Sequence, residues 1–179
     1  MSTVALKRGM KGGIKKFDPA NHQKNDDRAK KVLIAYLNEK SVGKPWTTIE
    51  NSCIYGIDVL TINSQNEIIA AYDVEVREKN WTEKSRIRFP TINCIERKDY
   101  LWRGDAKLSS VESRFTISPS CEFFYVQFNA HCDRFYAIKG STVLQYPLVR
   151  WPNRLEGDVE EYVRQVPQEK AYYVVIGKK

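Results

Sequence analysis

The clearest periodic stretch of the chain has the spacing of an amphipathic helix. Between Asp26 and Lys40, apolar residues return every three or four positions, at Ala29, Val32, Leu33, Tyr36 and Leu37. In a helix this spacing places them on one side. The polar residues 25–27 supply capping groups and negative charge suited to a helix N-terminus. Residues 26–40 are therefore predicted to form a helix that ends before Gly43.

Two neighbouring stretches have the composition of β-strands. Residues 57–62 and 68–77 are rich in Ile, Val and Tyr, and the polar residues 63–67 lie between them. Two such stretches with a loop of about four or five residues between them are typical of a hairpin. We therefore expect these strands to pair in the antiparallel sense.

The second strand of this hairpin is predicted to have two unlike faces, because side chains alternate along a strand. One face is apolar throughout and consists of Ile68, Ala70, Tyr72, Val74 and Val76. The other begins apolar and then carries Asp73, Glu75 and Arg77. A strand buried on both sides would not tolerate three successive charged positions without an ion or a partner. The second face is therefore predicted to line a charged cleft.

The first strand of the hairpin brings a further acid to this face. In the register that places Asp58 directly across from Asp73, Asp58 is also diagonal to Glu75. Two or three carboxylates then surround one point. The loop admits other registers, and a slip of one residue turns Asp58 to the opposite face.

The rest of the chain is predicted to add strands and one short helix. Strand character is found at 89–95, 122–129, 134–138 and 171–176. Residues 158–165 have the pattern of a short helix, and 105–120 show no clear period. The predicted fold class is α/β. Residues 139–179 are either a structural addition or a dimer surface.

The first 25 residues are predicted to form a flexible basic arm. Glycines separate their cations, which are Lys7, Arg8, Lys11, Lys15, Lys16 and Lys24 against the single acid Asp18. Such an arm either tracks phosphates or is simply solvated. At 179 residues the chain is long enough for one domain and short for two. Residues 26–179 are therefore predicted to be a single domain.

The net charge restricts the classes of partner. The chain has 29 Lys and Arg against 22 Asp and Glu, for a net charge of +7 and a pI near 9.2. This favours an anionic partner, with nucleic acid before an anionic membrane surface. The sequence has no apolar run of about 18 residues, and its cysteines form no close pair such as a zinc site requires. We therefore expect an intracellular, cytoplasmic protein with reduced thiols and no membrane partner.

The acids of the hairpin suit the hydrolysis of phosphodiester bonds. That reaction uses a divalent ion to lower the pKa of an attacking water and to stabilise charge on the phosphate. Magnesium is held through hard carboxylate oxygens and waters, typically with one or two protein carboxylates. Asp58 with Glu75, aided by Asp73, meets this need. We expect Mg²⁺, or Mn²⁺ in its place, as the cofactor.

These residues also resemble a known family. An acid after Gly56 and Ile57 begins one strand, and an acid, a spacer and a basic residue lie on the next. This pattern is similar to the PD-(D/E)xK nuclease superfamily, which includes restriction-type endonucleases, Holliday junction resolvases and phage nucleases. The resemblance is specific over about residues 26–80. It implies a restriction-endonuclease-like core, a central mixed β-sheet flanked by helices, with the helix at 26–40 packed beside the hairpin.

The resemblance also implies roles for individual residues. Asp58 matches the first metal-binding acid, Glu75 the second, and Val76 the spacer whose carbonyl lies between the two motif positions. Arg77 stands where the family has lysine. A guanidinium stays protonated, so in this role Arg77 only orients the water and stabilises the phosphate electrostatically.

Two other placements stay open. Lys79 lies two residues further along the same face and is able to take the lysine role. Alternatively, Asp73 is the second acid and Glu75 holds the lysine position, a variant that the superfamily also shows. In that case Arg77 is a phosphate clamp.

Cations and an aromatic residue follow the proposed catalytic strand. A single charge of this kind more often serves solubility, but as a group these residues, together with the N-terminal arm, are candidates for nucleic-acid contacts. They are Lys79, Trp81, Lys84, Arg86, Arg88, Arg97 and Lys98.

Three functional hypotheses follow. The first is a magnesium-dependent DNA endonuclease working as a homodimer, with RNA as the other substrate class. The second is a non-catalytic nucleic-acid-binding module that kept the fold and lost the lysine. The third is a resolvase-like accessory factor in a larger replication, repair or viral assembly.

Overall fold

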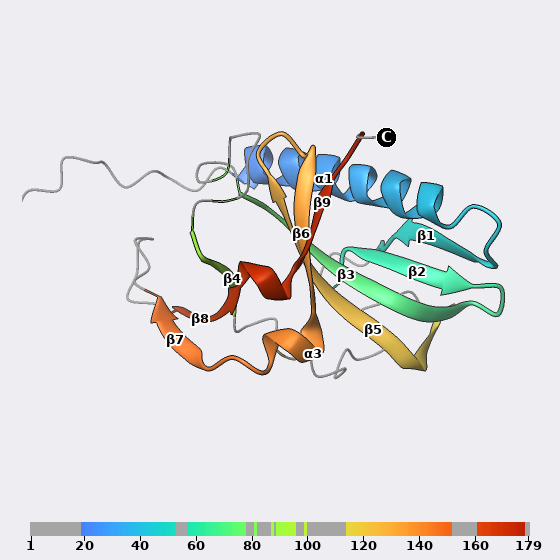
Figure 1. The fold of residues 1–179 in the computed structure, drawn as a ribbon. Helices are drawn as coiled ribbons and strands as arrows, with labels where there is room; N and C mark the ends of the chain where they lie inside the picture. Colours follow the sequence, from blue (N-terminus) through green and yellow to red (C-terminus); the bar gives the residue numbers. More distant parts are fainter. Residues whose placement is uncertain are drawn as a thin grey trace, which may run out of the picture.

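A mixed β-sheet of six strands lies at the centre of the described part of the chain (Figure 1). The computed structural model describes residues 19–52, 57–77, 81, 87, 89–95, 99, 114–151 and 161–177. The strands of this main sheet are β1 (Trp46–Glu50), β2 (Val59–Asn63), β3 (Glu67–Arg77), β5 (Thr116–Asn129), β6 (Arg134–Lys139) and β9 (Tyr172–Val175). They lie in the order β1-β2-β3-β5-β6-β9. All neighbours are antiparallel except β3 and β5, which are parallel.

Smaller elements lie around the main sheet. Helix α1 (Pro19–Lys40) runs along one side of it in Figure 1. A second sheet has the strand order β4 (Thr91–Ile95), β8 (Glu161–Pro167) and β7 (Leu148–Trp151). The one-turn helix α3 (Gly140–Val143) follows β6, and the 3₁₀ turn η3 (Gln168–Lys170) precedes β9. The protein is thus a single-domain α/β fold dominated by a mixed sheet, as predicted, with few helices.

The two faces of the main sheet pack against different elements. On one face, α1 buries apolar side chains against the sheet: Ala29, Leu33, Val59, Val74, Val126, Phe128, Cys132 and Phe135. On the other face, the small sheet and α3 complete a second core, which includes Leu60, Ala71, Ile92, Cys94, Tyr125, Tyr136, Ile138, Val143 and Val166. Within the described residues, α1 is therefore the only long helix that flanks the sheet, and a layer of strands covers the face where a second helical layer was expected.

Helix α1 begins earlier than the spacing predicts. It starts at Pro19 rather than Asp26 and ends at Lys40, as predicted. Proline suits the first turn of a helix because its missing N–H would lack an intrahelical partner there. The chain leaves the helix through Gly43, whose φ of +81° is readily available to glycine. The last residues of the predicted basic arm are thus helical, and residues 1–18 lie outside the described residues.

The hairpin of β2 and β3 has the register that brings the acids together. Val59 pairs with Tyr72, so that Asp58, one position further on, comes opposite Asp73. Near the turn the pairing shifts between Thr61 and Ile62. There the Asn63 side-chain oxygen accepts from the backbone N–H groups of residues 65 and 67. The change of register is thus confined to the part of the hairpin near the turn, and the end that carries Asp58 and Asp73 has the predicted register.

One predicted helix is wrong. Most of the stretch 158–165 that was assigned to a short helix belongs to strand β8, and residues 152–160 lie outside the described residues. Strand β8 pairs with β4 on one side and with β7 on the other. Pairing on both edges overrides a local preference for helix. Strand β5 is also longer than predicted, because residues 116–120, which show no clear period, belong to it.

Within the described ranges, no helix combines the length with the apolar character that a membrane span requires.

Candidate functional site

The charged face of β3 lies against the strands of the second layer. The parallel register pairs Asp73 with Tyr125 and Glu75 with Gln127 of β5. Asp73 is only 5% exposed, whereas Glu75 and Arg77 are half-buried. The three charged side chains predicted to share a face do so, and they meet polar side chains of β5. This face is more deeply buried at Asp73 than an open cleft would be.

Asp58 is held against the backbone of β3. Its carboxylate Oδ2 accepts a hydrogen bond from the backbone N–H of Val74 at 2.8 Å. Its own N–H donates to the carbonyl of Tyr72, and its carbonyl accepts from Asn51. Val74 is the residue between Asp73 and Glu75, so the Asp58 carboxylate is fixed beside the segment that carries both acids.

Lys30 of α1 lies near the same end of β2. Its ammonium group is 3.2 Å from Glu50 and 3.3 Å from Asp27. Burial lowers the pKa of Lys30, but the hydrogen bond to Glu50 and the charge of Asp58 outweigh burial and raise it above the ordinary value. A charged lysine therefore neutralises part of the negative charge that Asp58 brings to this region.

A buried tyrosine orients Glu75. The hydroxyl of Tyr125 donates to the Oε2 of Glu75, and Tyr125 is 1% exposed. Burial, with the negative charge of Glu75, raises the pKa of Tyr125 well above its ordinary value. Tyr125 therefore remains protonated and serves as a hydrogen-bond donor.

Arg77 is held by Gln127. The fully buried amide of Gln127 lies 2.8 Å from the Tyr125 hydroxyl. With its oxygen turned toward Arg77, this amide accepts from Nε at 2.8 Å and from Nη2 at 3.2 Å. Arg77 Nη2 also lies 3.5 Å from the carbonyl of Asn93 on β4. Glu75, Tyr125, Gln127 and Arg77 thus form one polar network between the two sheets.

The thiol of Cys94 lies close enough to Glu75, Asp73 and Arg77 for their charges to affect its pKa. Its side chain is fully buried on β4, and burial raises its pKa well above the ordinary value. The negative charges of Glu75 and Asp73 add to this effect, and the charge of Arg77 opposes it. Both acids therefore act on the same buried thiol and favour its protonated form.

The described residues contain no group of three or more His, Cys, Asp or Glu side chains close enough to hold a metal ion. The carboxylate oxygens near this face come from Asp58, Asp73 and Glu75. The side chain of Val76 packs on the α1 face, so only its backbone carbonyl is available as a ligand. Carboxylate oxygens are the donors that Mg²⁺ prefers, and it often keeps several waters.

The aromatic residue predicted to contact nucleic acid belongs to the core, which corrects that prediction. Trp81 is 2% exposed, and its ring lies 5.0 Å from that of Tyr136 and 6.4 Å from that of Tyr173. A ring packed in this way is not available to stack on a base. The other predicted contacts lie outside the described residues: Lys79, Lys84, Arg86, Arg88, Arg97 and Lys98.

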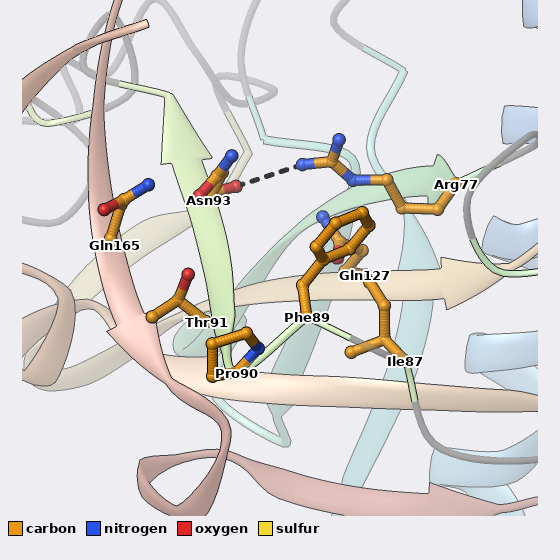
Figure 2. Close-up of a pocket in the computed structure, with 8 residues that line it drawn as sticks. All are labelled: Arg77, Ile87, Phe89, Pro90, Thr91, Asn93, Gln127 and Gln165. Carbon is orange, nitrogen blue, oxygen red and sulfur yellow. Dashed lines mark hydrogen bonds between the residues drawn. The ribbon is translucent and has the colours of Figure 1, made fainter.

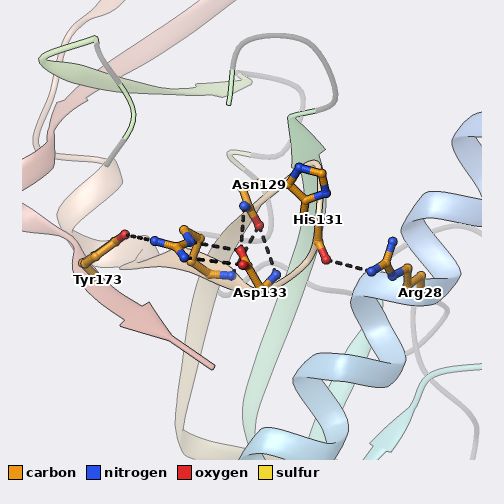
Figure 3. Close-up of polar contacts among 6 residues, drawn as sticks. Arg28, Asn129, His131, Asp133 and Tyr173 are labelled. Carbon is orange, nitrogen blue, oxygen red and sulfur yellow. Dashed lines mark hydrogen bonds and ion pairs between the residues drawn. The ribbon is translucent and has the colours of Figure 1, made fainter. Parts of the chain in front are cut away.

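A second polar cluster shapes the turn between β5 and β6 (Figure 3). Asn129 donates to Asp133 at 2.8 Å, and Arg134 donates to the same carboxylate at 3.0 Å. The hydrogen bond from Arg134 lowers the pKa of Asp133. On the side of α1, Arg28 donates to the carbonyl of His131 at 2.8 Å. This cluster ties the turn to the helix and is separate from the acids of β3.

A pocket of about 280 Å³ opens beside Arg77 (Figure 2). Its apolar lining comes from Ile87, Phe89 and Pro90. Its polar lining comes from Arg77, Thr91, Asn93, Gln127 and Gln165. No local pattern in the sequence indicates this pocket, because its lining brings together residues of β3, β4, β5 and β8 that are far apart in the chain.

Comparisons of the chain with protein-family models, with curated proteins and with solved structures give no match.

Proposed function

We propose that this protein is a metal-dependent endonuclease that hydrolyses phosphodiester bonds of DNA with carboxylate-bound Mg²⁺. The observation that carries the proposal is the hydrogen bond from the Val74 N–H to Asp58 at 2.8 Å. It holds Asp58 Oδ2 at the backbone of the residue between Asp73 and Glu75, which supports the assignment of these acids to one site. In the terms of the PD-(D/E)xK resemblance, Asp58 is the first metal-binding acid and Glu75 the second.

The donor set fits a hard divalent cation. Asp58 and Glu75, or Asp58 and Asp73 in the alternative assignment, would offer two carboxylates, and Val76 would offer a backbone carbonyl, with waters completing the coordination of the ion. A bound Mg²⁺ or Mn²⁺ supplies charge stabilisation at the phosphate and a water of lowered pKa. Lys30 offsets part of the repulsion at Asp58, and the Tyr125 hydroxyl orients the carboxylate of Glu75.

Arg77 acts in this proposal through its charge alone. A guanidinium remains protonated, so Arg77 cannot accept a proton from the attacking water. Its Nε is held by Gln127, which directs the rest of the group toward the pocket side of the site. In the alternative assignment, Asp73 is the second acid, Glu75 takes the lysine position and Arg77 clamps the phosphate.

The architecture is compatible with the resemblance. A mixed sheet carries the hairpin, and α1 packs against β1 and β3 beside it. The net charge of +7 favours a polyanionic substrate. The basic residues Lys79, Lys84, Arg86, Arg88, Arg97 and Lys98 are the proposed phosphate contacts. A homodimer in the cytoplasm is part of the same proposal.

A specific observation favours a second candidate function. Glu75 and Arg77 are hydrogen-bonded within the protein, to Tyr125 and to Gln127. Charged groups satisfied in this way suit a non-catalytic nucleic-acid-binding module, or a resolvase-like accessory factor, that retains the fold. This candidate differs from the first in predicting binding without cleavage.

Cleavage assays separate the two candidates. Purified protein is incubated with supercoiled, linear, single-stranded and branched DNA, and with RNA, in Mg²⁺ or Mn²⁺. Asp58→Ala and Glu75→Ala are expected to lose about 100-fold or more of the activity, because bound metal contributes several kcal/mol to such reactions. Glu169→Ala, which changes an exposed acid on η3, is the matched control. Undiminished cleavage by both site variants would remove the site assignment, and binding without cleavage would favour the second candidate.

Arg77→Lys tests the role of the guanidinium in the same assay. If Arg77 stands in the lysine position of the family, the substitution keeps or raises the cleavage rate. If Arg77 clamps a phosphate with two parallel hydrogen bonds, lysine cannot replace it. A large loss of cleavage in Arg77→Lys therefore selects the assignment with Asp73 as the second acid.

A further inference from the structure

The pocket beside Arg77 has the size of a site for one small ring system. Its volume of about 280 Å³ lies just below the roughly 300–1,000 Å³ that small-molecule sites occupy. In Figure 2 the amides of Asn93 and Gln165 lie on one side, the Phe89 ring lies on the other, and the guanidinium of Arg77 lies at one end. A flat ligand with polar edges matches this arrangement.

Phe89 provides an exposed aromatic surface that is held in place. Its side chain is 53% exposed. The side-chain amide of Gln168 donates to the carbonyl of Ile87 at 2.8 Å and also to that of Phe89. The backbone N–H of Gln168 donates to the carbonyl of Pro90 at 3.0 Å. These contacts hold the backbone at residues 87, 89 and 90, so the aromatic ring of Phe89 is attached to a fixed backbone.

Two amide side chains face the pocket from neighbouring strands. Asn93 of β4 and Gln165 of β8 are directly paired in the small sheet, and both are half-buried. Neither side-chain amide makes a hydrogen bond to another residue in the described part of the chain. Each amide offers a donor and an acceptor side by side, which is the arrangement that hydrogen-bonds the edge of a nucleobase.

Arg77 connects the pocket to the acids. Its contacts with Gln127 and Asn93 use Nε and Nη2. Its Nη1 has no hydrogen bond among the residues that the structure describes. Guanidinium groups bind phosphate well, so Arg77 is placed to contact the phosphate of a nucleotide whose base enters the pocket.

We infer that this pocket binds one unpaired nucleobase of a nucleic-acid strand, with Phe89 stacking on the base and Asn93 and Gln165 contacting its edge. A base within a duplex is stacked and paired, and it enters such a pocket only when it is unpaired or extruded. The inference rests on the proposed function for the identity of the ligand, and it specifies the substrate as a strand with an unpaired base near the cleaved bond.

Binding is measured without divalent metal, in EDTA, so that cleavage does not interfere. One probe is a duplex with a single unpaired 2-aminopurine, whose fluorescence falls when the base stacks on an aromatic ring. A second probe is the same duplex with an abasic residue at that position. A fully paired duplex and a free purine mononucleotide complete the set. The proteins are the wild type, Phe89→Ala and Gln165→Leu, with Tyr172→Ala as the control because Tyr172 is similarly exposed, at 59%, on β9.

The wild type is expected to bind the duplex with the unpaired base more tightly than the abasic duplex and to quench the 2-aminopurine. Phe89→Ala should weaken binding of the unpaired base by about 5- to 150-fold, the range found when an aromatic stacking partner is removed. It should leave binding of the abasic duplex unchanged. Gln165→Leu should weaken the same probe by a smaller factor, and Tyr172→Ala should match the wild type.

The inference would be overturned if the wild type bound the duplex with the unpaired 2-aminopurine and the duplex with the abasic residue equally tightly. It would also be overturned by an equal loss on both duplexes in Phe89→Ala, or by a mononucleotide that binds as tightly as the unpaired base in its strand. Failure of the endonuclease proposal has a different signature. In that case the preference for the unpaired base persists in EDTA, and no cleavage occurs when Mg²⁺ or Mn²⁺ is added.

Discussion

The two faces of the main sheet come from the same strands and bury different chemistry. On the α1 side, Val74 meets an apolar layer that includes Phe128 and Leu33. On the other side, Asp73 and Glu75 of the same strand meet the buried hydroxyl of Tyr125 and the amide of Gln127. The first face is stabilised by the close packing of apolar side chains alone. The second also requires that each polar group has a partner, since an unpaired buried polar group is costly.

The comparison predicts the largest loss of stability on the apolar face. Phe128 is fully buried, and its ring lies 5.0 Å from that of Phe135. Phe128→Ala should lower the free energy of unfolding by about 3–5 kcal/mol, the usual range for truncating a buried phenylalanine. Urea unfolding followed by circular dichroism measures this change. A loss below about 1 kcal/mol would mean that α1 and the sheet do not form a tight core.

A smaller effect is expected on the polar face. Gln127→Leu keeps a side chain of similar size and removes the acceptor that holds Arg77. Leaving a buried donor unsatisfied costs about 1–3 kcal/mol. The matched control is Gln145→Leu, at an exposed glutamine just after α3, which should change the free energy of unfolding by less than about 0.5 kcal/mol. Equal stability of the two variants would contradict the role of Gln127 in the network.

The smallest effect is expected at the partly exposed ion pair of Asp133 and Arg134 in the β5–β6 turn. The pKa of Asp133 is lowered by its hydrogen bond with Arg134. Its stabilising contribution is therefore complete above the ordinary carboxyl pKa of about 3.9 and is lost as the pH falls through the lower folded value. Asp133→Asn should be less stable than the wild type near neutral pH by under about 1 kcal/mol, as for exposed ion pairs.

Thermal melting of the wild type and Asp133→Asn across the acidic range checks this sign. The two melting temperatures should converge as the pH falls below that of an ordinary carboxyl group. A difference that stays constant with pH would show that the charge of Asp133 does not contribute.

The sequence predicted one face of the hairpin better than the other. The alternation of side chains along 68–77 was enough to predict that Val74 lies on one face of the strand and Asp73 and Glu75 on the other, because the period of a strand is two. The register with Asp58 opposite Asp73 was one of several that the loop admitted, and the structure has it. What this face packs against was not predictable, since Tyr125, Gln127 and Asn93 reach it from strands distant in the chain.

Other misreadings have the same physical origin. Trp81 follows the charged strand and is predicted to contact nucleic acid, but it packs on Tyr136 in the core. The stretch 158–165 has a local pattern that favours a helix, yet most of it forms the central strand of the small sheet. In both cases a contact with a segment distant in the chain determines the burial or the secondary structure, and such a contact cannot be predicted from the local sequence.

The central claim is that Asp58 and Glu75 hold a divalent cation together, and calorimetric titration with Mn²⁺ tests it most directly. Wild-type protein is compared with Asp58→Asn and Glu75→Gln, and with Asp133→Asn as an acid from the β5–β6 turn. The account predicts that the wild type and Asp133→Asn bind Mn²⁺ alike, and that both site variants lose most of the binding. Equal Mn²⁺ binding by all four proteins, or none by the wild type, would contradict it.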